Sequence, residues 1–252
     1  MLAVNQIYNR DCLEGMKEIE SGSVDLILAD LPYQITQNSW DSIIPLPALW
    51  EQYRRVIKPN GAIVLTAAQP FTSILLLSNP RMFKVEWIWR KSRRTGFLNA
   101  KKQPLRIHES VLVFYGKQPT YNPQWTAGKP YTCFNTSTHS NKGNYGDYPE
   151  YTTTSDGRRY PVTILEFANE VKTVHPTQKP VSLFEYFIRT YSNEGELVLD
   201  SCVGGGTTAI AALRTNRRFI GFELNEDYFQ VAQARIAAEK EREPNLLTEA
   251  QE

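Results

Sequence analysis

The chain has 252 residues, of which 41% are hydrophobic and 22% charged, and its formal net charge is +1. This is the composition of an ordinary globular protein and excludes a disordered chain, while the length suits one large domain or a core with an insertion. No apolar run approaches the roughly 20 residues of a membrane helix, and the first ten residues lack the pattern of a signal peptide, so we expect neither.

Strand-like apolar runs alternate with helix-like segments, which is typical of an α/β sheet with helices on both faces. In chain order the predicted elements are a helix at Asp11–Glu20, a strand at Val24–Asp30, a helix at Pro45–Ile57, a strand at Gly61–Ala67, a helix at Pro70–Ser78, strands at Val85–Arg90 and Glu109–Tyr115, a helix at Pro180–Tyr191, a strand at Glu196–Asp200, a helix at Thr207–Thr215, a strand at Arg218–Glu223 and a helix at Asn225–Glu239. We expect the charged tail at 241–252 to fray.

One long segment interrupts this alternation. Between Lys117 and Tyr160 the chain is rich in Thr, Ser, Asn, Gly and Pro, yet it carries eight aromatic residues. So long a loop is uncommon unless it is functional or disordered, and the aromatic content argues against disorder. We therefore predict an irregular recognition insertion at residues 117–172, between core segments at 1–116 and 173–240.

Positive charge is concentrated between Arg81 and Lys117, where ten Lys or Arg residues meet two acids, Glu86 and Glu109, for a local balance of +8. Such a run is either a solvated face or a surface that contacts phosphates. We favour contact with the backbone of a nucleic acid. The residues predicted to make it are Lys91, Arg93, Arg94, Lys101 and Lys102.

The apolar run that starts at Val24 leads directly into Asp30-Leu31-Pro32-Tyr33. A carboxylate and a backbone carbonyl can accept the two hydrogens of an exocyclic amino group while the aromatic ring stacks on its base. Methylation of an adenine or cytosine amino group requires this apparatus. The alternative is that Asp30 only stabilises a turn.

A second motif follows the strand that ends at Asp200. Gly204-Gly205-Gly206 precedes a helix, and the next strand ends at Glu223, 19 residues beyond Gly204. Glycines let the backbone approach a ligand, and an acid so placed can bind ribose hydroxyls. The pattern also fits the fingerprint of NAD enzymes or a mere tight turn. The tetrapeptide has no role in hydride transfer, which disfavours an NAD enzyme.

The two motifs resemble those of S-adenosylmethionine-dependent DNA amino-methyltransferases of the N6-adenine and N4-cytosine family. The group with beta-type order is the nearest, because there the catalytic tetrapeptide precedes the cofactor motif. The family's Asp-Pro-Pro-Tyr is here Asp30 to Tyr33, and its Asp-Pro-Phe-x-Gly-x-Gly-Thr-Thr is Asp200 to Thr208. His175 to Pro180 is similar to the motif beside the cofactor's methionine end, and Ile7 to Cys12 to the strand and loop near its adenine.

The resemblance implies a Rossmann-like class I methyltransferase fold, with a doubly wound, mostly parallel sheet and a target-recognition insertion. It implies that Asp30, Leu31, Pro32 and Tyr33 are catalytic, that the base is flipped out of the duplex, and that its nitrogen attacks in line without a covalent enzyme intermediate. The residues that it places against S-adenosylmethionine are Asp11, Cys12, Asp30, His175, Thr177, Gln178, Lys179, Asp200, Cys202, Gly204, Gly206, Thr207, Thr208, Glu223 and Leu224.

Two residues depart from the family pattern. Leu31 replaces a proline, but the resemblance implies that this position contributes its backbone carbonyl, which leucine retains. Cys202 replaces a phenylalanine that packs near the cofactor's purine, so cofactor affinity or pose is expected to differ. Asp11 either caps the following helix or contacts the cofactor, and Lys179 either contacts the cofactor, caps a helix or forms a surface salt bridge.

We expect no metal, because His108 and His139 lack ligand partners at useful spacing. The three cysteines form no CxxC pair, which disfavours disulfides and fits a reducing cytoplasm.

The resulting prediction is a site-specific DNA adenine-N6 methyltransferase, since Asp rather than Ser at the first tetrapeptide position favours adenine in this family. The alternatives are a DNA cytosine-N4 methyltransferase and a non-catalytic DNA-binding relative. A protein glutamine methyltransferase is disfavoured, because its tetrapeptide begins with Asn and follows the cofactor motif. The expected partner is double-stranded DNA, at the nucleoid of a bacterial or phage-infected cell, while a homodimer and a cognate restriction enzyme are left open.

Overall fold

The computed structural model describes residues 2–33, 44–135, 151–170 and 178–249. The chain divides into two compact units, one formed by Met1–Asn122 with Thr163–Glu252 and one by Pro123–Val162. In the described residues no helix has the length and apolar character needed to cross a membrane.

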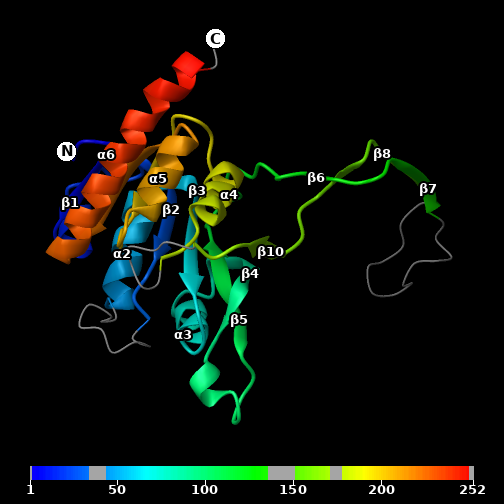
Figure 1. The fold of residues 1–252 in the computed structure, drawn as a ribbon, viewed down its shortest axis with the longest axis horizontal. Coiled ribbons are helices and arrows are strands. Elements are labelled where there is room, and N and C mark those ends of the chain that lie inside the picture. The colour runs from blue at the N-terminus through cyan, green and yellow to red at the C-terminus, as the bar shows by residue number, and fades with distance from the viewer. Residues whose placement is uncertain (1, 34–43, 136–150, 171–177, 250–252) are drawn as a thin grey trace. The chain divides into compact units, whose positions relative to one another are not determined.

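Within its described residues, the first unit is built on an eight-stranded sheet with the order β1-β12-β11-β2-β3-β5-β4-β10 (Figure 1). Its strands are β1 (Gln6–Asn9), β2 (Val24–Asp30), β3 (Ile57–Ala67), β4 (Phe83–Thr95), β5 (Arg106–Phe114), β10 (Ile164–Phe167), β11 (Leu197–Asp200) and β12 (Arg218–Glu223). β5 runs antiparallel to β3 and β4, and the other neighbouring strands run parallel. The predicted mostly parallel α/β fold is therefore confirmed.

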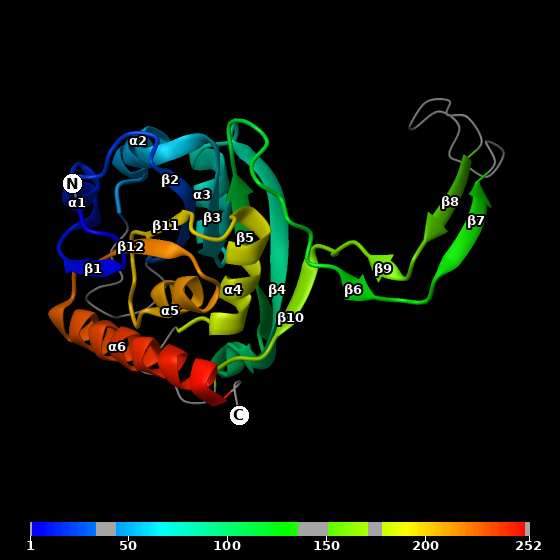
Figure 2. The same cartoon turned by 90° about the horizontal axis from the view of Figure 1, so that it is seen from above.

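Helices cover both faces of this sheet (Figure 2). One face carries α1 (Cys12–Met16), α2 (Leu46–Val56) and α3 (Phe71–Ser78), and the other carries α4 (Val181–Tyr191), α5 (Thr207–Arg214) and α6 (Glu226–Glu249). Successive strand residues point to opposite faces, so Leu26 and Leu28 of β2 pack in the core with α4 and α5, whereas Ile27 and Ala29 pack with α1 and α2. Full burial of such an aliphatic side chain stabilises the fold by about 1.5–3 kcal/mol.

The fold differs from the sequence prediction at three places. β10 lies inside the segment expected to be irregular, yet it pairs with β4, and Trp89 Nε1 donates to the Phe167 carbonyl at 2.9 Å. A strand of four residues carries too short a pattern to be recognised. α1 ends at Met16 instead of Glu20, because residues 18 and 19 bond three residues back in tightened turns. α6 continues to Glu249, where we expected fraying, although Pro244 lies within this last part of the helix.

The described residues of the second unit form two small sheets. β6 (Thr126–Ala127) pairs with β9 (Arg158–Arg159), and β7 (Tyr131–Asn135) pairs with β8 (Tyr151–Ser155), both antiparallel. Aromatic and cationic side chains pack locally, since the Trp125 and Tyr160 rings lie 4.2 Å apart and Arg158 lies 5.2 Å from the Trp125 ring. These side chains pack locally while they stay exposed, Trp125 to 41% and Tyr160 to 68%, so local contacts and not a buried core join the described residues of this unit.

Hydrogen bonds within the first unit hold the two residues, Asn122 and Thr163, at which its chain adjoins the second unit. The backbone N–H of Asn122 donates to the Thr190 carbonyl at 2.8 Å, and the Asn122 side chain also donates to the carbonyls of Arg189 and Ser192. The Thr163 carbonyl accepts the Ile88 N–H at 2.7 Å. The chain thus leaves and re-enters the first unit at fixed points.

Candidate active site

Three adjacent parallel strands each end in a carboxylate. Asp30 ends β2, Asp200 ends β11 and Glu223 ends β12, and these strands are neighbours in the sheet. Open α/β sheets bind ligands beyond the carboxyl ends of their strands. A cavity of about 740 Å³ lies there and is lined by all three acids. Its volume falls within the range of small-molecule sites.

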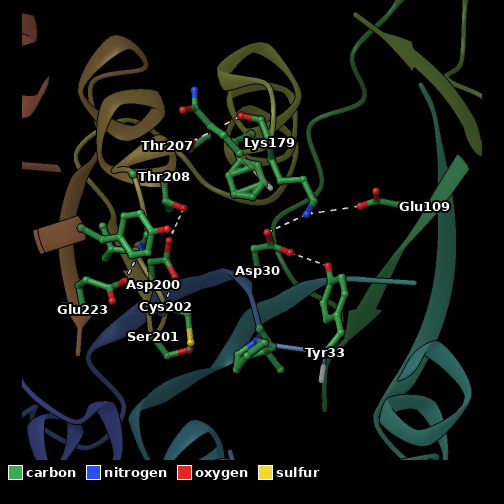
Figure 3. A pocket seen from close by; sticks show the side chains of 18 of the residues that line it. Asp30, Tyr33, Glu109, Lys179, Asp200, Ser201, Cys202, Thr207, Thr208 and Glu223 are labelled. Carbon is green, nitrogen blue, oxygen red and sulfur yellow. Dashed lines mark hydrogen bonds and ion pairs between the residues drawn. The ribbon is translucent and has the colours of Figure 1, made fainter. Parts of the chain in front are cut away.

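The Asp30 carboxylate is held on both oxygens (Figure 3). Oδ1 accepts hydrogen bonds from the Tyr33 hydroxyl at 2.5 Å and from the Thr66 hydroxyl, and Oδ2 accepts one from Lys179 Nζ at 2.7 Å. The Tyr33 ring stacks on Phe71, with 5.3 Å between ring centroids. Burial and the nearby Asp30 raise the pKa of Tyr33 well above 10, so the phenol stays protonated and donates. An ionised carboxylate has about four acceptor sites, so Asp30 retains room for one more donor.

The Lys179 side chain is only 6% exposed, so the predicted alternative in which Lys179 forms a surface salt bridge is wrong. Its ammonium lies 2.7 Å from Asp30 Oδ2 and 3.4 Å from Glu109 Oε2. Burial alone would lower the pKa of Lys179, but Asp30 and Glu109 together raise it above its ordinary value. Lys179 is therefore a fixed cation beside the Asp30 carboxylate.

The glycine turn lies at the other end of the cavity. Gly206 has φ 85° and precedes α5 directly, and a Cβ there would lie 3.3 Å from Ala232 Cβ, so the turn and its packing both favour glycine. The Gly204 N–H donates to Glu223 Oε2 at 2.7 Å, which ties the turn to the end of β12. The turn and the acid thus form one rigid unit.

Asp200 is 4% exposed and accepts hydrogen bonds from the Thr208 hydroxyl at 2.5 Å and the Cys202 N–H at 2.9 Å. Burial raises the pKa of Asp200 to about 7 and also raises the pKa of Glu223. Glycine backbone, a helix N-terminus and two carboxylates in one cavity fit a nucleoside that carries a cationic group. S-adenosylmethionine is such a molecule.

Most of the predicted cofactor residues lie together in this cavity. Asp11 lines it and also caps α1, because its Oδ1 accepts from the Leu13 N–H at 2.8 Å. Gly206 shapes the turn from behind, and His175 and Thr177 lie outside the described residues. The predicted cofactor residues that line the cavity are Asp11, Cys12, Asp30, Gln178, Lys179, Asp200, Cys202, Gly204, Thr207, Thr208, Glu223 and Leu224.

The structure separates Lys91 from the other predicted DNA-contacting residues. Arg93, Arg94, Lys101 and Lys102 are exposed around the 3₁₀ turn η1 (Phe97–Asn99), at the tip of the β4–β5 hairpin (Figure 1). Lys91 is 8% exposed and pairs with Glu109 at 3.0 Å, so it lies inside the fold and not on the surface where we predicted a phosphate contact. Strand periodicity gives the reason, since Lys91 follows buried Trp87 and Trp89 on the inward face of β4.

Two residues beside Asp30 were not predicted. Thr66 lies opposite Asp30 in the β2–β3 register and donates to its carboxylate. Glu109 lies in β5 and joins Lys91 to Lys179. The sequence offered one signal, an acid next to the buried run Ser110–Phe114, but only the sheet order brings β5 near β2.

Residues 24–234 match the model of a protein family described as DNA methylase. The chain belongs to this family. Its members are S-adenosylmethionine-dependent enzymes that methylate amino groups of adenine or cytosine in DNA. The motif resemblance to this family is confirmed, and the chain is an S-adenosylmethionine-dependent DNA methyltransferase.

Full-length relatives support this assignment. The methyltransferase is 29% identical to the Type II methyltransferase M1.MboII of Moraxella bovis, over 92% of this chain and 96% of the relative. It is 27% identical to the DNA adenine methyltransferase YhdJ of Escherichia coli K12, over 91% of this chain and 82% of the relative. The crystal structure of the M1.HpyAVI–SAM complex is 26% identical and superposes with a TM-score of 0.60, covering 91% of this chain and 98% of that one. The cytosine-N4-specific PvuII methyltransferase, at 15% identity and a TM-score of 0.68, covers 96% of this chain and 93% of its own and shares the fold.

Proposed function

We propose that this methyltransferase modifies the N6 amino group of adenine within a specific DNA sequence. The observation that carries the proposal is the single cavity that joins Asp30 and Tyr33 to the glycine turn and Asp200. A flipped base can thus meet its methyl donor in one enclosed space. The relative YhdJ is named as an adenine methyltransferase, which supports adenine over cytosine.

We propose that Asp30 and the Leu31 carbonyl each accept one N–H of the target amino group. This draws the nitrogen towards tetrahedral geometry and frees its lone pair for in-line attack, so catalysis comes from positioning and fixed electrostatics. S-adenosylmethionine supplies an electrophilic methyl group carried on a sulfonium. Tyr33 stacks on the flipped base and returns about 1–3 kcal/mol of the cost of unstacking it.

We also propose a division of labour on the DNA. Arg93, Arg94, Lys101 and Lys102 contact the backbone from the hairpin tip, because they are exposed and carry no acid between them. The insertion at 117–172, most of which forms the second unit, reads the target sequence. A homodimer and a cognate restriction enzyme stay open predictions, as does the nucleoid location.

Methylation-sensitive sequencing of DNA from cells that express the protein tests this function. We expect N6-methyladenine at one short recognition sequence, and none from cells that express Asp30→Ala. Modified cytosine would overturn the assignment to adenine and indicate methylation of the cytosine N4 amino group instead. Full methylation by the Asp30→Ala protein would overturn the mechanism.

A further inference from the structure

Four charged side chains form a continuous line through the wall of the catalytic cavity. Lys91 Nζ lies 3.0 Å from Glu109 Oε1. Lys179 Nζ lies 3.4 Å from Glu109 Oε2 and 2.7 Å from Asp30 Oδ2 (Figure 3). Their side chains are between 6% and 23% exposed. β4, β5, the segment just before α4 and β2 each contribute one member, so the line crosses the sheet towards the Asp30 carboxylate.

Glu109 makes this group of four side chains electrically neutral. The charges of two lysines and two acids sum to zero, and without Glu109 the remaining three charges sum to +1. A target nitrogen gains positive charge as it accepts a methyl group, and the donor itself is a sulfonium. An uncompensated positive charge in this buried wall would therefore oppose the transition state, because charges act strongly in a water-poor site.

The contact of Glu109 with Lys179 is also placed so that it does not compete with Asp30. Glu109 Oε2 is buried and has no well-aligned hydrogen bond from the residues that the structure describes, and its 3.4 Å ion pair with Lys179 is longer than the 2.7 Å contact of Lys179 with Asp30. Lys179 gives its short hydrogen bond to Asp30 instead. Glu109 thus neutralises the ammonium and fixes its position without withdrawing it from the catalytic carboxylate.

We propose that Glu109 is a positioning residue for methyl transfer and acts through Lys179. It neutralises one positive charge beside Asp30, so that the Asp30 carboxylate stays in place and presents its negative charge to the target amino group. The inference rests on the proposed function, because it assigns the task of Glu109 within the same site.

This role predicts a specific response to pH. The charged and titratable groups around Lys179 are Asp30 at the end of β2, Tyr33 just after it, Glu109 from β5 and, on the far side of Glu109, Lys91 from β4. Asp30 and Glu109 raise the pKa of Lys179, and burial opposes them. Removing the Glu109 charge therefore lowers the pKa of Lys179, and loss of its proton at alkaline pH then occurs at lower pH.

The experiment compares Glu109→Gln, which keeps the shape, with Glu109→Asp, which keeps the charge. We measure single-turnover methylation of a duplex that carries the recognition sequence between pH 6 and 10. For Glu109→Gln we expect a fall in rate on the order of 10²-fold, an unchanged affinity for DNA, and a loss of activity that begins below pH 10. Wild type, whose Lys179 pKa lies above its ordinary 10.5, shows no such loss in this range, and Glu109→Asp restores most of the rate and the wild-type profile. The matched control is Glu166→Gln, which removes an exposed acid of the edge strand β10 that pairs with Arg90 of β4. We expect it to leave the rate and the pH profile unchanged.

A second variant separates charge balance from simple damage. In the double variant Lys91→Met with Glu109→Gln, the remaining charges of Lys179 and Asp30 again sum to zero. We therefore expect the double variant to methylate DNA at least about tenfold faster than Glu109→Gln alone, although it lacks one more side-chain contact. A double variant as slow as the single one, or a Glu109→Gln rate equal to wild type, or a reduced rate with an unshifted pH profile, would each overturn the proposal.

The proposed function can fail separately. If the wild-type protein methylates no DNA, the coupling is still measured by thermal unfolding of the protein alone. A lysine with a raised folded pKa stabilises the fold at lower pH and loses that contribution as pH rises through the folded value. The loss of stability at alkaline pH must be smaller in Glu109→Gln than in wild type, because its folded Lys179 pKa lies less far above the unfolded value, and coincident curves refute the coupling.

Discussion

Asp200→Asn is expected to stabilise the protein while weakening its hold on S-adenosylmethionine. Burial raises the pKa of Asp200 from 3.8 to about 7. The folded state therefore binds this proton more tightly than the unfolded chain, and the free energy of unfolding falls as pH rises from about 4 to about 7. The difference between the two pKa values corresponds to about 4 kcal/mol above pH 7.

An asparagine carries no charge, so it removes this cost. Its single oxygen replaces two that accept from Thr208 and Cys202, which returns about 1 kcal/mol of the gain. The net increase in the free energy of unfolding is about 3 kcal/mol at pH 8 and below about 1 kcal/mol at pH 5. Urea denaturation of both proteins at these two pH values measures it.

Cofactor affinity is expected to change in the opposite direction. The ionised fraction of Asp200 rises from about a tenth at pH 6 to about nine-tenths at pH 8, so the affinity of wild type for the cationic cofactor rises about tenfold over this interval. Calorimetric titration with S-adenosylmethionine should show this rise in wild type and weak, pH-independent binding in the variant. An Asp200→Asn protein that is no more stable at pH 8, or that binds the cofactor as wild type does, would refute the reasoning.

Three further outcomes follow from the site. Asp30→Ala abolishes methylation but retains calorimetric binding of S-adenosylmethionine, and loss of both would mean that Asp30 mainly builds the cofactor site. Arg93→Ala with Arg94→Ala lowers DNA affinity and reduces the slope of log K against log salt by about 2, as followed by fluorescence anisotropy, and an unchanged slope would remove the hairpin tip from the DNA contact. Gly206→Ala destabilises the fold by more than about 1 kcal/mol in urea denaturation, because φ is 85° and Ala232 is close, and an unaffected midpoint would contradict this.

The sequence predicted the parts of the structure whose signal is local. β2 and β12 have the predicted bounds, because a buried strand is a continuous apolar run that ends at a polar residue. Asp30, Asp200 and Glu223 could be placed in one site because the ends of parallel strands share an edge of the sheet.

The rest depended on contacts between distant segments. β10 is too short to show a period, and its pairing with β4 exists only in the folded sheet. Glu109 and Lys179 are 70 residues apart in the numbering and meet because β5 is inserted between β3 and β4. The placement of Lys91 could have been predicted from its alternation with Trp87 and Trp89, but the charge of its neighbours suggested a surface instead.

The two anchored ends of the second unit have an evolutionary consequence. The chain leaves the first unit after Asn122 and returns to it at Thr163, and both junctions are secured by bonds that belong to the first unit. The carboxylates, the glycine turn and the buried lysines all lie in the first unit, outside the segment between these junctions. On the proposed role of the insertion in reading DNA, a lineage of such enzymes acquires new target sequences by replacing this one segment, while the first unit is inherited unchanged.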